Sequence, residues 1–338
     1  MKNDTLNKLD FELGEKYQAA LRRRAYGMML PILKKENVDI ILSFYLLNSG
    51  WIAQLLANEL NIPCVAGVRG NDIGRNIFHT SRFAVVKWVV DEANAIVCVN
   101  EHLKHRATVA FKEIRNKTLT IPNGFDCSKA DLCQKQNRSV LVKWGWSKDD
   151  LILAFIGTLR EKKGVAVLMK SLQMVNSLNV HVRLFVVGPS IGGAEKVAIG
   201  NIWNDLVKNN IIRFTGQVPR EDVLFNASVA DAICIPSLDD GMANGLLEGM
   251  AIGLCPITTT VLGDVVRDGD NGIVVEPGNA CALVEAIELL YKDRILLRKY
   301  GERSRKIIRD FFRPEQEAQK YIHLFKKILE EKNEYTTV

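Results

Sequence analysis

Two carboxylates, Asp240 and Glu248, are separated by seven residues in the segment SLDDGMANGLLEGMAIGLCP. Gly241 stands directly after the first carboxylate, where a glycine lets the backbone come close to a ligand. The apolar spacing that follows predicts a helix over residues 243–252. The free N–H groups at its start, on residues 241–244, would point at a bound ligand and favour an anion.

The two carboxylates suit different parts of a ligand. Glu248 is expected about one to two turns inside the helix, where it can accept hydrogen bonds from two neighbouring ribose hydroxyls. Asp240, at the helix mouth, suits a hexose. The alternative is that Asp240 is only a helix N-cap and Glu248 an exposed helix residue. The flanking glycines favour a ligand site over that alternative.

A second candidate segment, FIGTLREKKG, leads from a strand into a helix. Gly157 opens a tight turn, and Lys163 precedes the helix, where an ammonium group and backbone N–H groups can hold a diphosphate. The segment alone leaves open that Lys163 is a solvated member of a charged loop. Gly188, in VVGPSIGG, is interpreted as a strand-end turn near the phosphates, because the spacing GxGxxG is absent.

These motifs lie in a chain that alternates strand and helix patterns. Short apolar runs predict buried parallel strands at residues 39–45, 63–68, 95–99, 151–156, 182–187, 211–214, 231–235 and 272–275. Stretches of helical spacing separate them, among them WIAQLLANEL and CALVEAIELLY. The alternation predicts an α/β protein with doubly wound sheets that bind ligands at the carboxyl ends of their strands.

A length of 338 residues suits two domains. The polar stretch CSKADLCQKQNRS interrupts the strand and helix alternation, so we place the boundary near residue 145. The expected parts are an N-terminal domain over 1–145, a C-terminal domain over 146–312 and a last helix over 313–338.

Composition narrows the partners and the compartment. Hydrophobic residues make up 47% of the chain, and no apolar run approaches the about 20 residues of a membrane span. Seven scattered cysteines indicate a reducing compartment, and the first residues do not form a secretory signal, so we expect a cytoplasmic protein. No interleaved basic and aromatic pattern points to nucleic acid.

Together the motifs resemble the retaining GT-B glycosyltransferases, known as glycosyl transferases group 1. The hallmark of that family, two glutamates separated by seven residues, corresponds to Asp240 and Glu248. The resemblance covers residues 38–330 and rests on motifs in the family's order: VRGND, IPNGFD, FIGTLREKKG, VGP, RFTGQV, PSLDDG, LLEGMAIGLCPI and VVRDGDNGIVVEPGN.

The resemblance implies a GT-B fold, two Rossmann-like domains facing a cleft, and transfer of a hexosyl group from a GDP- or UDP-linked donor to an acceptor hydroxyl. It implies retention of the anomeric configuration and no metal or other cofactor. Polysaccharide or glycolipid synthesis is the expected setting. The implied donor-binding residues are Glu248 for the ribose, Val218 for the base, Lys163 and Gly188 for the diphosphate, and Asp240, Gly241, Met242, Ala243, Asn244 and Leu247 around the sugar.

Three positions depart from the family pattern. Asp240 replaces the usual Glu. Thr158 stands where an Arg usually binds the diphosphate, and Arg160 is the nearest substitute. Arg69 stands where many relatives carry a His near the reacting sugar. An Arg there can stabilise an oxyanion but cannot act as a base, and a structural salt bridge to Asp72 is an equal alternative.

The family's first strand and Gly-rich loop have no counterpart before the first strand pattern, so the N-terminal domain is expected to lack its first βα unit. Two alternatives to a transferase therefore stay open. One is a non-catalytic sugar-nucleotide-binding subunit completed by a partner chain. The other is a GT-B-fold sugar-nucleotide epimerase, which needs no acceptor.

Basic residues are concentrated at the two ends of the sequence. Residues 292–327 contain twelve Lys or Arg against five Asp or Glu, and residues 1–38 contain eight against five. Solvated helix faces are the usual explanation of such runs. The alternative is peripheral association with anionic lipid at the inner face of the membrane, which would suit a lipid-linked acceptor.

Overall fold

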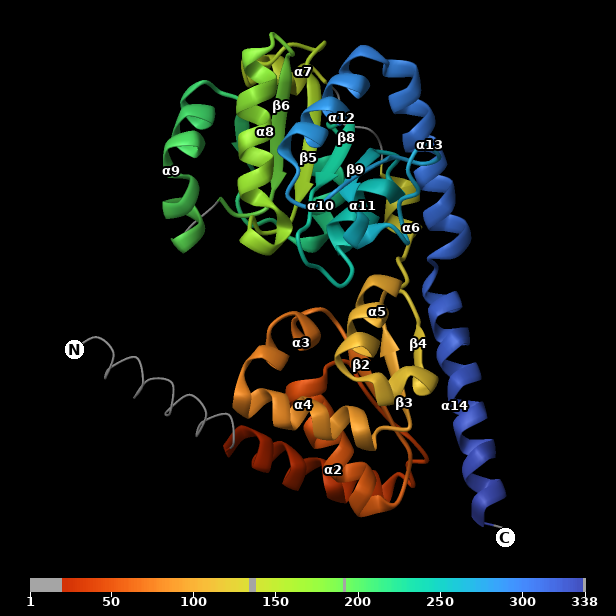
Figure 1. Ribbon diagram of the computed structural model, residues 1–338. Coiled ribbons are helices and arrows are strands. Elements are labelled where there is room, and N and C mark those ends of the chain that lie inside the picture. Colours follow the sequence, from red (N-terminus) through yellow and green to blue (C-terminus); the bar gives the residue numbers. More distant parts are fainter. Residues whose placement is uncertain (1–19, 134–137, 191–192, 337–338) are drawn as a thin grey trace, which may run out of the picture. The chain divides into compact units, whose positions relative to one another are not determined.

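A computed structural model describes residues 20–133, 138–190 and 193–336. The chain forms two compact units, each built around its own parallel sheet (Figure 1). Unit 1 comprises residues 1–121 and 320–338, and unit 2 comprises residues 122–319.

Unit 1 contains a four-stranded sheet in the order β1-β2-β3-β4, with every pair parallel. Its strands are β1 (Ile41–Ser43), β2 (Cys64–Val68), β3 (Ala95–Cys98) and β4 (Thr118–Thr120). The connecting helical segments are η1 (Leu46–Gly50), α2 (Trp51–Leu60), α3 (Asn71–Gly74), η2 (Asn76–Phe78), α4 (Thr80–Glu92), α5 (Glu101–Ala110) and η3 (Lys112–Lys117). Strand β1 forms one edge of this sheet.

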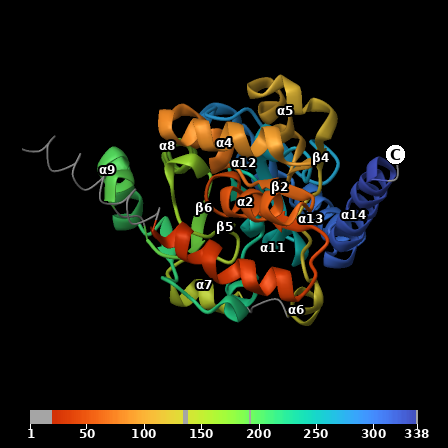
Figure 2. The same cartoon turned by 90° about the horizontal axis from the view of Figure 1, so that it is seen from below.

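Two groups of apolar contacts hold the sheet of unit 1 between helices. The helix over residues 20–35, shown in red in Figure 2, packs Tyr26, Leu30 and Leu33 against α2 and β1. A separate cluster joins Val65 and Val97 of the sheet to side chains of α14 (Pro314–Thr336). The end of the long last helix, from residue 320, is therefore part of unit 1, although the residues that precede it in the sequence belong to unit 2.

Unit 2 contains a six-stranded parallel sheet in the order β10-β9-β8-β5-β6-β7. Its strands are β5 (Leu151–Ile156), β6 (Val182–Val187), β7 (Ile212–Phe214), β8 (Ala232–Ile235), β9 (Cys255–Thr259) and β10 (Ile273–Val275). Its helical segments, besides the start of α14, are α6 (Ser128–Leu132), α7 (Ser139–Lys143), η4 (Glu161–Lys163), α8 (Val165–Ser177), α9 (Gly193–Lys208), η5 (Arg220–Asp222), α10 (Val223–Ala227), α11 (Asn244–Ala251), η6 (Thr260–Leu262), α12 (Ala280–Lys292) and α13 (Arg294–Phe311).

The sheet of unit 2 lies between two layers of helices. Helices α9, α8 and α12 pack side by side in one layer, and α10, α11 and α13 pack in the other (Figure 1). Strands β5 and β8 lie at the centre and are buried along their whole length. This burial on both faces explains why their sequences are continuous apolar runs without alternation.

The units divide at Ile121, whereas the sequence led us to place the boundary near residue 145. The intervening polar stretch packs on unit 2. Arg138 donates to the Asp231 carboxylate at 2.5 Å, and Trp146 Nε1 donates to the Asn210 carbonyl at 2.6 Å. Leu141 is fully buried in the unit 2 core. Polar composition marked this segment as a linker, but its few apolar anchors attach it to the second sheet.

All eight predicted strands are present, and the two sheets confirm the predicted α/β class of two parallel-sheet domains. The sequence missed two strands, β4 and β9. The first has only three residues, two of them threonine, and the second begins at a Cys-Pro pair and continues in threonine, so neither is an apolar run. Residues 1–19, which precede the first predicted strand, lie outside the described residues.

Candidate functional site in unit 2

The candidate site lies where β5, β6 and β8 end, at the carboxyl edge of the unit 2 sheet. The turns after β5 and β6 approach each other closely, because a Cβ built on Gly188 would lie only 2.3 Å from the carbonyl oxygen of Gly157. Gly188 also has a positive φ of 154°, which strains any other residue. The predicted strand-end turn at Gly188 therefore has a structural reason, and it lies beside the loop that carries Lys163.

Hydrogen bonds fix the loop after β8 against the loop after β5. Thr259 Oγ1 donates to the Ser237 carbonyl at 2.7 Å, which holds the end of β8 to β9. The amide of Leu238 donates to the Lys162 carbonyl at 2.8 Å, which joins the two loops. As a result, Lys162 Nζ lies 3.8 Å from Asp240 Oδ1. The sequence did not single out Lys162, because it is one of four consecutive charged residues at positions 160–163 of the same loop.

Asp240 is buried, with 7% of its surface exposed. Its Oδ1 accepts the amide of Gly241 at 2.9 Å, so the Gly241 amide, which we expected to be free for a ligand, is already bonded. Asp240 is not the N-cap of α11 either, since Ala243 holds that position without a side-chain cap. Among the residues that the structure describes, Asp240 Oδ2 and the buried hydroxyl of Ser237 have no hydrogen-bond partner.

The two unpartnered oxygens are unusual for buried polar groups. A buried oxygen without a partner costs about 1–3 kcal/mol, so most such groups in folded proteins are hydrogen-bonded. The carboxylate can only accept hydrogen bonds, while the serine hydroxyl can donate and accept. Together they match a ligand with hydroxyl groups.

Lys163 lies beside the turn after β5, since a Cβ built on Gly157 would be 3.6 Å from its Nζ. Burial lowers the pKa of the Lys163 ammonium, and the nearby carboxylates of Asp240 and Glu248 oppose that effect. An ammonium group that is partly desolvated interacts strongly with an anionic ligand, because water screens it poorly. Lys163, Asp240 and Glu248, predicted separately from two motifs, thus share one electrostatic environment.

Glu248 lies on α11, the helix that follows the loop after β8. Burial raises the pKa of its carboxyl, and the positive charges of Arg220 and Lys163 lower it. The sequence missed Arg220, which belongs to the short segment η5. Its only signal was its place two residues after Val218, a predicted donor contact.

Helix α11 begins at the end of β5. A Cβ built on Gly245 would lie 2.4 Å from the Ile156 carbonyl oxygen, so the helix start is held directly against the strand. Asn244 is exposed, and its Oδ1 accepts from Asn123 at 3.4 Å. The side chains of Ala243 and Leu247 belong to the core, and Met242 packs partly on it. Ala243 and Leu247 can therefore offer a ligand only their backbone groups.

The remaining predicted residues of unit 2 flank this centre. Thr158 and Arg160 are exposed in the loop after β5. Val218 lines a pocket of about 530 Å³ whose aromatic members are Trp144, Phe185 and Phe214. Trp144 and Phe185 contact each other with ring centroids 4.9 Å apart.

Arg69, the predicted residue of unit 1, follows β2. Its guanidinium lies over the Phe44 ring, 4.5 Å from the centroid, and its backbone N–H donates to Asp72 Oδ2 at 3.1 Å. Asp72 is buried and also accepts the amide of Leu46 at 3.0 Å. Burial raises the pKa of Asp72, and these backbone hydrogen bonds lower it. Asp72 therefore fixes the loops after β1 and β2 through backbone amides.

A pocket of about 530 Å³ opens beside Asp72 at the carboxyl ends of β1 and β2. The residues that line it are polar or cationic for the most part: Arg22, Tyr45, Leu47, Asn48, Ser49, Asn71, Asp72, Asn76 and Arg82. Arg22 comes from the helix over residues 20–35, within the basic stretch 1–38 that the sequence suggested as a solvated helix face or a membrane-facing segment.

Comparison with known families decides the class of the protein. Residues 137–307 match the family described as glycosyl transferases group 1, and residues 13–129 match glycosyltransferase family 4. The chain belongs to the glycosyl transferases group 1. The family 4 match falls mainly on unit 1 of this glycosyltransferase, and the group 1 match falls on unit 2.

Individual relatives agree with that assignment. The glycosyltransferase is 27% identical over 293 residues to an uncharacterized glycosyltransferase of Methanocaldococcus jannaschii, a match that covers 85% of this chain and 75% of the relative. It is 25% identical over 281 residues to the putative teichuronic acid biosynthesis glycosyltransferase TuaC of Bacillus subtilis, which covers 81% of this chain and 67% of TuaC.

Solved structures confirm the fold. Sucrose-phosphate synthase of Thermosynechococcus elongatus superposes with a TM-score of 0.75 at 20% identity, covering 90% of this chain and 77% of that one. HepE of Anabaena, in complex with UDP-glucose, superposes with a TM-score of 0.72 at 15% identity, covering 89% and 82%. The predicted GT-B fold is thus confirmed for this glycosyltransferase. Within the described residues, no helix is long and apolar enough to cross a membrane.

Proposed function

We propose that this glycosyltransferase moves a hexosyl group from a nucleoside diphosphate sugar to an acceptor hydroxyl, with retention of configuration and without a metal. The observation that carries the proposal is the pair of unpartnered buried oxygens, Asp240 Oδ2 and Ser237 Oγ, beside the ammonium of Lys163. A hexose offers hydroxyls to the two oxygens, and a diphosphate offers negative charge to Lys163.

Each element of the site has a role in this proposal. Glu248 accepts hydrogen bonds from the ribose hydroxyls. Its carboxylate is partly buried, and the positive charge of Arg220 favours its ionised form. Lys163, with Arg160 and the amides at the start of α11, stabilises the charge that grows on the leaving diphosphate. Asp240 positions the transferred hexose. Arg69, in unit 1, is proposed as a catalytic cation that cannot act as a base, because its guanidinium stays protonated.

We further propose UDP as the nucleotide of the donor. HepE, whose fold this chain shares, was solved with UDP-glucose. The aromatic pocket beside Val218 offers an apolar wall for a base, to which Trp144 and Phe185 contribute. Binding of UDP that GDP does not displace would support this choice. Tighter binding of GDP than of UDP would contradict it.

The proposed acceptor site is the pocket of unit 1 lined by Arg22, Arg82 and Asp72. Two guanidinium groups suit an acceptor that carries phosphate, because their planar donors match phosphate oxygens. Polysaccharide or glycolipid synthesis is therefore our proposed setting, with a lipid-linked acceptor.

The same helix that supplies Arg22 has an apolar outer face. Met28 and Ile32 are 61% and 58% exposed, and Leu21 and Met29 lie on the same side. Arg24 and Lys35 flank this face and suit anionic headgroups. We propose that this face rests on an anionic membrane surface, which would bring a lipid-linked acceptor to the neighbouring pocket.

Co-sedimentation with vesicles tests the membrane proposal. Vesicles with anionic lipid should recover most of the protein, and vesicles of neutral lipid should recover little. Changing Met28 and Ile32 to Ser should remove this difference, whereas Leu178→Ser, at an exposed apolar residue of unit 2, should not. Equal recovery on both kinds of vesicle would contradict the proposal.

Substitutions in unit 2 test the donor site. Glu248→Ala and Lys163→Ala should each lower transfer by at least about 100-fold, since each removes a charge from the buried site. Glu285→Ala and Lys143→Ala, at exposed residues that form no ion pair within the described residues, are the matched controls. Near-normal activity of either site variant with a folded protein would overturn the assignment.

The products distinguish the proposal from its two alternatives. A product with the donor's anomeric configuration, observed by NMR, supports retaining transfer. An epimerised donor in the absence of acceptor would indicate an epimerase. Donor binding without turnover, restored by a second protein, would indicate a subunit that needs a partner chain.

A further inference from the structure

A second pocket of unit 2, of about 880 Å³, lies at the opposite end of the sheet from the donor site. Its lining includes Asp150, Asp231 and Leu254, which directly precede β5, β8 and β9. The donor-site loops follow the carboxyl ends of β5, β6 and β8. Because all these strands are parallel, the two sites are at opposite edges and can be occupied at the same time.

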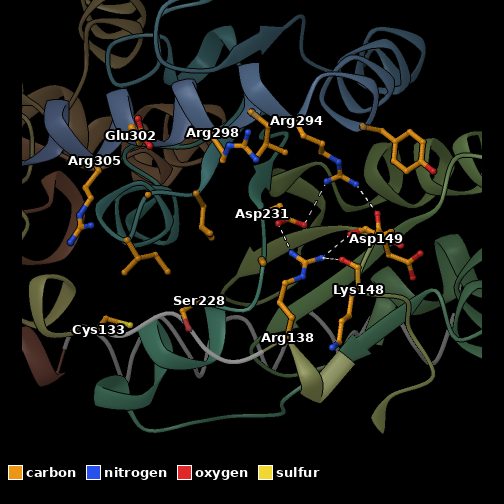
Figure 3. Close-up of a pocket in the computed structure, with 17 residues that line it drawn as sticks. Cys133, Arg138, Lys148, Asp149, Ser228, Asp231, Arg294, Arg298, Glu302 and Arg305 are labelled. Carbon is orange, nitrogen blue, oxygen red and sulfur yellow. Dashed lines mark hydrogen bonds and ion pairs between the residues drawn. The ribbon is translucent and has the colours of Figure 1, made fainter. Parts of the chain in front are cut away.

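Helix α13 supplies one wall of this pocket with a stripe of charged side chains. Arg294, Arg298, Glu302 and Arg305 face it at spacings of four, four and three residues, which place them on one side of the helix (Figure 3). The helix is held close to the pocket floor, because a Cβ built on Gly301 would lie 2.2 Å from the Gly253 carbonyl oxygen.

Two of the lining arginines share one carboxylate, that of Asp231. Figure 3 shows Arg138 and Arg294 reaching Asp231 from two sides, at 2.5 Å and 3.8 Å. Arg294 also donates to the Asp149 carbonyl at 2.9 Å, and Arg138 donates to the Lys148 carbonyl at 2.9 Å. These contacts make Arg138 and Arg294 fixed parts of the wall.

The other lining cations also carry positive charge in excess of their paired carboxylates. Arg298 and the ammonium of Lys148 are exposed and have no ion pair within the described parts of the chain. Arg305 lies 3.7 Å from Asp131, but that carboxylate also pairs with Arg309, so one negative charge serves two arginines. An anion in the pocket would meet positive charge from α13 and from the segment before β5.

The rest of the lining indicates more than a bare anion. Asp149 and Glu302 add carboxylates that can accept hydrogen bonds from hydroxyl groups. Ile252, Leu254 and Leu297 add an apolar floor. A phosphate ester of a sugar combines these features, because its phosphate suits the cations, its hydroxyls the carboxylates and its ring the floor.

We propose that this pocket binds a phosphorylated sugar, at a site separate from the donor site. The proposal depends on the charges of Arg298, Lys148 and Arg305 and does not depend on the identity of the donor. A phosphosugar bound here would contact Ile252 and Leu254, which follow α11, the helix that begins at the donor site.

Calorimetric titration of the full chain with hexose 6-phosphate, inorganic phosphate and unphosphorylated hexose tests the proposal. Hexose 6-phosphate should bind the chain more tightly than inorganic phosphate does, and the free hexose should not bind. The double variant K148Q/R298Q should weaken binding at least about 10-fold. The matched double variant K143Q/K299Q removes the same charge from exposed positions outside the pocket and should bind normally.

A second comparison separates this site from the donor site. Hexose 6-phosphate should bind normally to the variant K163A/E248A, in which the donor site is disabled. Loss of binding in that variant, or equal affinity of K148Q/R298Q and the wild type, would overturn the proposal. Equal affinity for inorganic phosphate and hexose 6-phosphate would overturn its sugar component.

Discussion

At the scale of single residues, the site contains charged groups in environments that disfavour their charge. Burial raises the pKa of Glu248 and lowers that of Lys163. Asp240 keeps a buried oxygen without a partner in the described structure. Such groups lower the free energy of unfolding, and they are typical of binding sites.

Replacement of Glu248 by Gln should therefore stabilise the empty protein while it weakens donor binding. At neutral pH the melting temperature should rise by about 2 °C. The gain should shrink as the pH falls towards 4.5, the ordinary pKa of Glu. In that range the folded wild type takes up a proton on Glu248 before the unfolded chain does, and this stabilises the wild type. Thermal melts at several pH values, with Glu285→Gln as control, measure the difference.

Lys163 should give donor affinity a pH dependence. Because burial lowers its pKa, the ammonium loses its charge at a lower pH than an exposed lysine would, and donor affinity should fall as the pH rises. Lys163→Arg should bind the donor more weakly at neutral pH but with little change from about pH 7 to about pH 10, since Arg stays charged. A wild type and a variant with parallel pH profiles would argue against Lys163 as the diphosphate ligand.

At the scale of elements, the site depends on contacts between backbone segments. Helix α11 presents Glu248 from a fixed position only because Gly245 allows its first turn to touch the end of β5. The turn at Gly188 is likewise in contact with Gly157. Side chains at these positions would separate the loops that hold Lys163 and Asp240.

Gly245→Ala should destabilise unit 2 by about 1–3 kcal/mol, because its Cβ would overlap the Ile156 carbonyl, and should weaken donor binding. Gly200→Ala is the matched control. That glycine lies inside α9 with no atom within 4 Å of a built Cβ, so alanine should stabilise the helix by about 0.5–1 kcal/mol. Urea unfolding and donor titration of both variants check this, and equal effects would contradict the role of Gly245.

At the scale of the whole molecule, the last helix belongs to both units. It begins in unit 2 at Pro314 and ends on the sheet of unit 1, where Tyr321, Leu324 and Ile328 join the core. The stability of unit 1 therefore depends on a segment that follows unit 2 in the sequence.

Leu324→Ala should destabilise unit 1 by about 2–5 kcal/mol and leave unit 2 close to normal, because Leu324 is 8% exposed within the unit 1 core. Ile322→Ala, at a residue of the same helix that is 43% exposed, should change little. Hydrogen exchange of the two sheets measures each unit separately. Equal loss of protection in β3 and β5 would contradict this independence.

The sequence alone determined eight of the ten strands in the described residues, the two-domain α/β class and the family. Buried parallel strands are continuous apolar runs, as in β5 and β6, so local composition was sufficient to find them. The motifs around Lys163 and Glu248 were recognisable for a similar reason, because glycines and charges at strand ends form a local pattern.

Only the tertiary structure decided which groups meet. The approach of Lys162 to Asp240, the approach of Arg220 to Glu248 and the division at Ile121 all depend on how separate segments pack. The pocket at the amino ends of the unit 2 strands joins α13 to residues about 150 positions earlier in the chain, so no local pattern could indicate it. Chemistry that follows from neighbours in sequence was predictable, whereas chemistry that follows from long-range packing required the fold.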